Sequence, residues 1–101
     1  MKTLKTRPFD PAKYLDDDEA IADYLTDALE TGDPAFVSDS LGVVARARGM
    51  SDIARIAGMS RESLYRALSA DGNPKFETVL RVMHALGLRF SANVTRRKKV
   101  A

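Results

Sequence analysis

The chain has 101 residues, 45% of them hydrophobic, which suits one small domain with a single core. It contains no cysteine, which excludes disulfide bonds and thiolate metal sites and agrees with a reducing cytoplasm. No apolar run approaches the roughly 18 residues that a membrane span needs, and no apolar core of a signal peptide follows the N-terminus. We therefore expect a cytoplasmic protein without membrane contact.

The net charge of +2 conceals a strong asymmetry between two parts of the chain. Residues 1–40 carry 4 Lys and Arg against 10 Asp and Glu, a net charge of −6, whereas residues 41–101 carry 12 against 4, a net charge of +8. This split suggests a polyanion as partner of the second part and a basic molecule as partner of the first. Attraction between the two parts, within the fold or across a dimer, would explain the same split.

Pairs of a capping residue and a proline divide the chain into helices. Asp or Asn can accept the free backbone N–H groups at a helix start, and Pro fits the first helical position because it has no N–H to lose. A glycine in the left-handed conformation commonly ends a helix. Helices are therefore predicted to start at Asp10-Pro11, Asp33-Pro34 and Asn73-Pro74, and to end at Gly32, Gly49 and Gly87. Residues 1–9, before the first of these starts, should form an extended arm.

The first predicted helix runs from about Asp17 to Glu30, with an apolar face formed by Ile21, Tyr24, Leu25, Ala28 and Leu29. The acidic run Asp16-Asp17-Asp18-Glu19 stands at its front, where negative charge meets the positive end of the helix dipole. Consecutive acids lack the alternating spacing of a calcium loop, so this run predicts stabilisation of the helix end and not a metal site.

Two further helices follow from the same spacing. One covers about residues 34–48 and buries Val37, Leu41, Val44 and Ala45. The other covers about residues 74–86 and buries Phe76, Val79, Leu80 and Met83.

The period changes after the last helix. Apolar Leu88, Phe90, Ala92 and Val94 alternate with polar residues, which predicts one half-buried strand over residues 88–94. A single strand has unpaired N–H and C=O groups on both edges and needs a partner. That partner is either the N-terminal arm near Leu4 or the same strand of a two-fold mate, and we favour the mate and hence a homodimer.

The stretch from Ser51 to Leu68 predicts a helix-turn-helix. The first helix must approach the second closely, which requires a small inner residue such as Ala54, and Gly58 can supply the positive φ that the turn needs. Ser60 is a good N-cap for a second helix from about Arg61 to Ser69. The space between the helices and the core would be filled by Ile53, Ala57, Met59, Leu64, Ala67 and Leu68.

The outward side of that second helix carries side chains that can contact DNA. Arginine can bind guanine through two hydrogen bonds, glutamate can accept from cytosine, and tyrosine can contact phosphate or a thymine methyl. The alternative is an ordinary helical hairpin whose arginines are only solvated. We predict DNA contacts through Ser60, Arg61, Glu62, Ser63, Tyr65 and Arg66, flanked by Arg55 and Lys75, with Arg46 and Arg48 as further phosphate contacts.

The residue types argue against an enzyme. His84 is the only histidine, cysteine is absent, and no Gly-rich phosphate loop occurs in the sequence. His84 falls near the C-terminal end of a predicted helix, where an imidazole interacts favourably with the dipole, so we expect a structural or surface role for it. We predict no catalytic residue, no metal site and no cofactor.

The helix-turn-helix resembles that of the Cro/C1-type (Xre) repressors, and the chain as a whole resembles the addiction-module antidote proteins, similar to HigA-type antitoxins. The segments that carry the resemblance span about 80 residues: F-D-P-A-K-Y-L (9–15), Y-L-T-D-A-L-E-T-G-D-P (24–34), A-R-A-R-G-M-S (45–51), G-M-S-R-E-S-L-Y-R-A-L-S (58–69), G-N-P-K-F-E-T-V-L (72–80) and A-L-G-L-R-F (85–90).

The resemblance implies an all-α domain of five to six helices, to which the spacing adds one C-terminal β-strand paired across a dimer. It implies a dimeric repressor that binds and neutralises a small basic toxin of the RelE/ParE-like type. The family's DNA-reading positions fall on Ser60, Arg61, Glu62, Tyr65 and Arg66. No toxin-binding residues can be carried over; from the charge split we place toxin contact between Asp16 and Asp39.

We therefore expect three parts: an acidic N-terminal arm and helix packed on the core (1–32), a helix-turn-helix domain with a C-terminal strand (33–95) and a basic tail (96–101). The predicted function is that of an antitoxin and sequence-specific repressor of a type II toxin-antitoxin module, with double-stranded DNA and a toxin as partners. A stand-alone phage-type repressor is one alternative. A protein-interaction module that keeps the fold without binding DNA is another.

Overall fold

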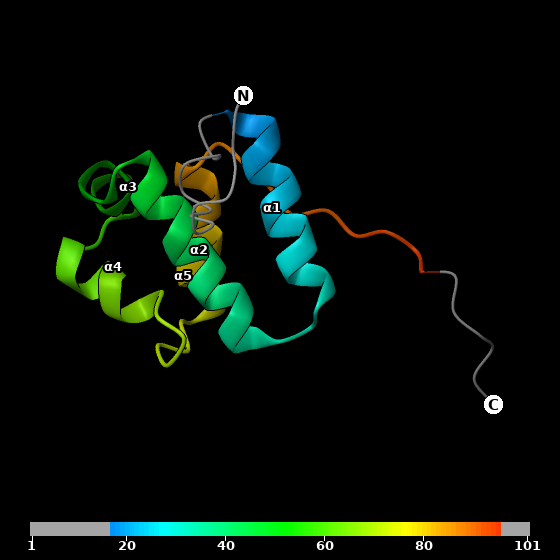
Figure 1. Ribbon diagram of the computed structural model, residues 1–101. Coiled ribbons are helices and arrows are strands. Elements are labelled where there is room, and N and C mark those ends of the chain that lie inside the picture. Colours follow the sequence, from blue (N-terminus) through cyan, green and yellow to red (C-terminus); the bar gives the residue numbers. More distant parts are fainter. Residues whose placement is uncertain (1–16, 96–101) are drawn as a thin grey trace, which may run out of the picture.

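The computed structural model describes residues 17–95, which form five α-helices around one core (Figure 1). The helices are α1 (Asp18–Glu30), α2 (Pro34–Arg48), α3 (Met50–Ala57), α4 (Arg61–Ala67) and α5 (Phe76–Ala85). The predicted N-terminal arm, the Asp10-Pro11 helix start, the pairing near Leu4, Asp16 and the basic tail lie outside the described residues. None of these five helices is long and apolar enough to cross a membrane.

The helix starts and ends follow from specific caps. The Asp17 carboxylate accepts the Ala20 N–H at 2.7 Å, and the Asp33 carboxylate accepts the Ala35 N–H at 3.0 Å, with Pro34 at the first position of α2. The neighbouring Asp18 forms an ion pair with Arg48 of α2. The acidic run therefore stabilises the start of α1, as predicted, and the three predicted terminating glycines all have positive φ angles: Gly32, Gly49 and Gly87.

Helix α3 lies at the centre of the arrangement and packs against α2, α4 and α5, while α1 packs against α2. The core is formed by side chains from all five helices and the turn after α4, and its members that are almost fully inaccessible include Ile21, Leu41, Val44, Leu64 and Val82. Most predicted inward residues of the first four helices are buried or half-buried; Leu29 is the exception, with 41% of its surface exposed. The helical core was therefore predicted well from spacing.

The last helix differs from the prediction at its start and on its apolar face. Asn73 does not cap it, because Asn73 has a φ of +47° and belongs to the turn between α4 and α5; α5 begins only at Phe76, after an extended Lys75. Phe76 and Leu80 are exposed, whereas Val82, which the prediction omitted, is fully buried. Apolar residues cover more than one stripe of α5, so spacing alone could not identify the stripe that meets the core.

The described chain has no strand at residues 88–94, contrary to the prediction, while the pairing with a two-fold mate stays a prediction. Residues 88–95 follow α5 as irregular chain: Leu88 and Phe90 still pack against the core, and the chain then extends away from the helices (Figure 1). No strand pairing forms within residues 17–95. The alternation of apolar and polar residues is present, but a strand also requires hydrogen bonds to a neighbour, and no described segment lies alongside to provide them. The fold is therefore all-α over the described residues.

Gly42 of α2 allows the backbone of the turn after α4 to approach closely. A Cβ atom at this position would stand 2.6 Å from the carbonyl oxygen of Leu68, a distance that real Cβ atoms essentially never show. The backbone at Leu68 therefore rests directly on the α2 backbone, which positions the C-terminal end of α4.

Replacing Gly42 by alanine should test this contact. Alanine normally stabilises a helix relative to glycine, but here the added methyl group must displace Leu68, so we expect Gly42→Ala to lower the free energy of unfolding by about 1–3 kcal/mol. Urea denaturation followed by circular dichroism measures this change. Thr26→Ala, on an exposed position of α1, is the control and should not destabilise; equal stability of the two variants would contradict the proposed close contact.

Candidate nucleic-acid interface

The turn between α3 and α4 is the one predicted for a helix-turn-helix. Gly58 has a φ of +74°, and the Met59 N–H donates to the Ala54 carbonyl at 2.9 Å, which closes the end of α3. The Ser60 hydroxyl then accepts the Ser63 N–H at 3.0 Å and caps α4. Ala54 is 2% exposed, as expected for the small residue where the two helices meet. Small residue, turn and cap are thus all confirmed.

Helix α4 has only seven residues, too few for a stable isolated helix, so its position depends on its neighbours. On its inner side Leu64 is fully buried, and Leu68 is buried just beyond its end. At that C-terminal end the buried Ser38 of α2 has its hydroxyl 3.2 Å from the Ala67 carbonyl oxygen and 3.0 Å from that of Ser69. Ser38 therefore shares its hydroxyl proton between the Ala67 carbonyl, at the end of α4, and the Ser69 carbonyl, which also accepts the Gly72 N–H at 2.9 Å.

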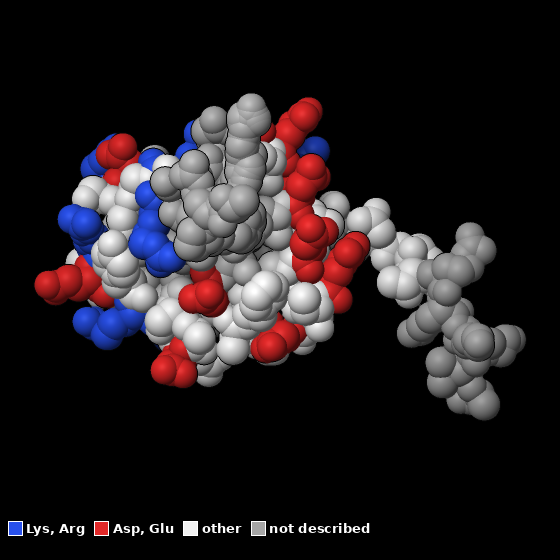
Figure 2. Space-filling view, viewed as in Figure 1, with Lys and Arg blue, Asp and Glu red and all other residues white. Residues whose placement is uncertain are grey.

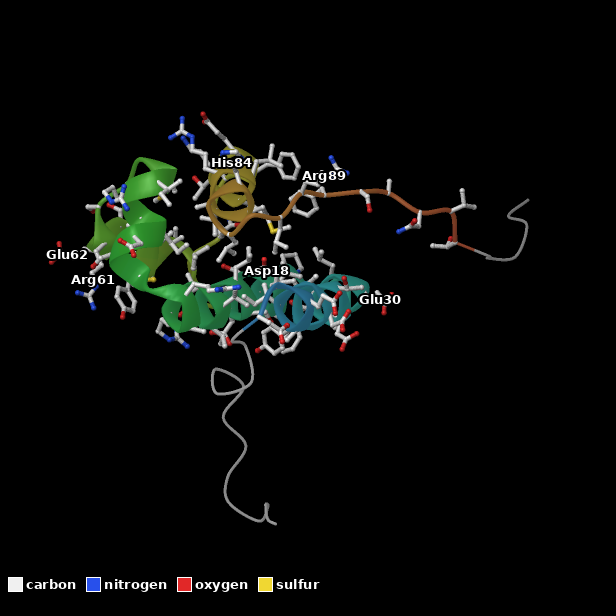
Figure 3. All side chains as sticks on the ribbon, turned by 90° about the horizontal axis from the view of Figure 1, so that it is seen from above. Asp18, Glu30, Arg61, Glu62, His84 and Arg89 are labelled. Carbon is white, nitrogen blue, oxygen red and sulfur yellow. The ribbon has the colours of Figure 1, made fainter. Side chains whose placement is uncertain are left out.

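The outer side of α4 holds the predicted contact residues. Arg61, Glu62 and Arg66 are exposed, Tyr65 is 42% exposed and Ser63 is half-buried. The guanidinium carbon of Arg61 lies 5.7 Å from the centre of the Tyr65 ring, a cation–π contact one helical turn apart. Figure 3 shows Arg61 and Glu62 at the end of the molecule opposite Glu30, the last residue of α1.

The basic residues predicted to flank α4 as phosphate contacts differ in whether they are already paired with an acid. Arg55 is exposed on α3 with its guanidinium 3.4 Å from the Asp52 carboxylate, and Lys75 is exposed at the start of α5. Arg46 is exposed, whereas the guanidinium of Arg48 is paired with Asp18 of α1; the phosphate contacts of both residues stay predictions. Spacing could not reveal that pair, because the two residues are 30 positions apart.

One basic residue near the turn was missed by the sequence reasoning. A guanidinium nitrogen of Arg81 lies 3.8 Å from where a Cβ atom of Gly58 would stand, so α5 brings this side chain beside the turn. Its other terminal nitrogen donates to Glu77 at 2.8 Å. The only available signal was the position of Arg81 on the α5 surface, and the contact depends on how α5 packs against α3.

Charge is distributed unevenly over the surface. Figure 2 shows Asp and Glu along the α1 side of the molecule, whereas Lys and Arg gather on the side of α3 and α4, interspersed with a few acids. The described residues include no group of three His, Cys, Asp or Glu side chains arranged to hold a metal ion. His84 is exposed in the last turn of α5 (Figure 3).

Comparison with known proteins identifies the family. A family model described as "Probable addiction module antidote protein" matches residues 5–94. The chain belongs to this family. It is also 47% identical over 94 residues to an uncharacterized protein of Haemophilus influenzae (strain Rd), an alignment that covers 93% of this chain and 97% of that protein. No solved structure matches. The resemblance deduced from the quoted segments is therefore confirmed, and membership implies in general terms a toxin that the antidote counteracts.

The Ser38 contact yields a prediction about the antidote protein's fourth helix. Ser38→Ala would remove the hydroxyl that donates to the Ala67 carbonyl, so we expect a loss of about 0.5–1.5 kcal/mol in the free energy of unfolding and faster hydrogen exchange of the α4 amides. Denaturation and exchange followed by mass spectrometry measure the two effects. Ser51→Ala, at an exposed position of α3, should change neither; unchanged α4 exchange in Ser38→Ala would show that this hydroxyl does not hold the helix.

Proposed function

We propose that this family member is the antitoxin of a type II toxin-antitoxin module that acts both as a sequence-specific DNA-binding repressor and as a direct inhibitor of a small, basic, RelE/ParE-like toxin. The proposal of DNA binding rests on one observation: Arg61, Glu62, Tyr65 and Arg66 are all exposed on the outer side of α4. We further propose that the chain acts in the cytoplasm as a homodimer, which would present two such helices to two half-sites.

The physical argument for DNA binding combines placement and chemistry. A helix capped by Ser60 and held at its other end by Ser38 presents a fixed set of side chains, and fixed side chains are what base recognition requires. The cation–π contact pre-orders Arg61 and Tyr65 in the free protein, which lowers the entropy lost when they bind. Exposed Arg55 and Lys75 would contact phosphates on either side.

The arginines of α4 provide the direct test. If Arg61 and Arg66 contact bases, the double variant Arg61→Ala/Arg66→Ala should lose roughly 1–3 kcal/mol of binding free energy per lost contact on DNA from upstream of its own gene. A gel-shift titration measures this loss. Arg89→Ala removes an exposed arginine that Figure 3 places away from α4 and should bind like the wild type. Wild-type affinity of the double variant would favour an interaction module that does not read DNA.

Lys75 tests the phosphate contact separately. Each released counterion contributes to the salt dependence of binding, so Lys75→Ala should weaken binding to all DNA sequences alike and reduce the slope of log K against log salt by about 1. Fluorescence anisotropy at several salt concentrations, with specific and unrelated DNA, gives both quantities. A selective loss on the specific DNA alone would assign Lys75 to base recognition.

A stand-alone phage-type repressor is the main alternative. It shares every DNA-binding expectation but requires no toxin beside its gene. The family description supports the antitoxin over this alternative, because an addiction module consists of a toxin and its antidote. Co-purification with the product of the adjacent gene distinguishes the two.

A further inference from the structure

An apolar groove extends from helix α1 to the turn between α4 and α5. Two hollows, of about 640 and 510 Å³, adjoin there and share Leu29 of α1 and Phe90 of the C-terminal segment as lining residues. The larger hollow also contains Phe76, which is 68% exposed and stacks on Phe90 with ring centres 6.0 Å apart. We call these two hollows the apolar groove. Adjoining exposed apolar side chains of this size commonly mark an interaction site.

One wall of the apolar groove is formed by chain with free backbone groups. Within residues 17–95, no backbone–backbone hydrogen bond involves residues 89–95, although several of these residues line the smaller hollow. The groove therefore offers hydrogen-bonding groups as well as apolar surface to a molecule that enters it, as sites that bind extended polypeptide do.

The opposite wall, helix α1, carries an acidic stripe. Glu19, Asp23, Asp27 and Glu30 fall on one side of the helix, next to the Ala22–Thr26–Leu29 side that lines the smaller hollow. All four are exposed, and in the described part of the chain none has a Lys, Arg or His nitrogen within 4 Å. Acids spaced four residues apart repel each other, so the stripe costs stability that no ion pair within residues 17–95 offsets.

From this combination we infer that the apolar groove and the acidic stripe together form a docking surface for a basic protein, which inserts apolar side chains into the groove and places Lys or Arg along α1. Charge favours a basic protein over a second copy of this chain as the molecule that binds here. A second copy would bring another acidic stripe toward this one, whereas a basic protein neutralises the stripe. The inference rests on the proposed antitoxin function, since the proposed toxin is a small basic protein. It narrows the toxin contact predicted for residues 16–39 to one side of α1 and adds the residues that line the apolar groove outside that range.

The test measures binding of the full-length protein to the purified product of the adjacent gene by isothermal titration calorimetry. Asp23→Lys/Asp27→Lys changes the net charge of the four-residue stripe from −4 to zero, and Phe76→Ser removes the exposed ring that stacks on Phe90. Each should weaken binding by roughly tenfold or more, because the charge attraction is lost in one case and an apolar anchor is lost in the other. The matched control Asp39→Lys/Asp71→Lys makes the same change of charge at exposed positions that line neither hollow and should bind like the wild type.

Circular dichroism and the gel shift on upstream DNA confirm that each variant is folded. If the wild type binds the adjacent gene product and the stripe and groove variants bind it equally well, the docking surface is wrong while the antitoxin function stands. If the variants instead abolish self-association measured by analytical ultracentrifugation, the occupant is a second copy and the inference is overturned. If the wild type does not bind the adjacent gene product, the proposed toxin partner and this surface both fail.

Discussion

The arrangement of this domain depends on a close backbone contact between α2 and the C-terminal end of α4. Seven residues cannot maintain a helix in water, so α4 exists because its two ends and its inner side are held. Ser60 caps one end, Ser38 donates to carbonyl groups at the other, and Gly42 lets the backbone at Leu68 approach. Because Ser38 and Gly42 lie one turn apart on α2, a single helix face determines how α4 is presented.

Features that depend on nearby residues could be predicted from the sequence. The bounds of α2 are those expected, because Asp33-Pro34 and Gly49 act within a few residues of the helix they delimit. The helix-turn-helix was predictable for the same reason: Ala54, Gly58 and Ser60 impose their conformations over one turn of chain. The family resemblance was carried by these local segments as well.

Features that depend on distant contacts could not be predicted in this way. The Asp18–Arg48 ion pair, the position of Arg81 beside Gly58 and the burial of Val82 all require knowledge of how two helices pack. The alternation from Leu88 to Val94 suggested a strand, but pairing is a property of two segments and spacing describes only one. The candidate contact residues of α4 were found from the sequence because they share one short helix.

The outer side of α4 and the C-terminal end of α1 lie at opposite ends of the molecule, and the larger hollow of the apolar groove reaches the turn after α4. Figure 3 places Arg61 and Glu62 at one end and Glu30 at the other. A protein seated along α1 leaves the outer side of α4 open, but one that also fills the larger hollow reaches Pro74 and Phe76, on either side of the proposed phosphate contact Lys75. The two partners would then meet at the start of α5 and stay apart elsewhere. One partner could therefore influence the other directly at the start of α5 or through the shared helical core, as a reciprocal coupling between the two sites.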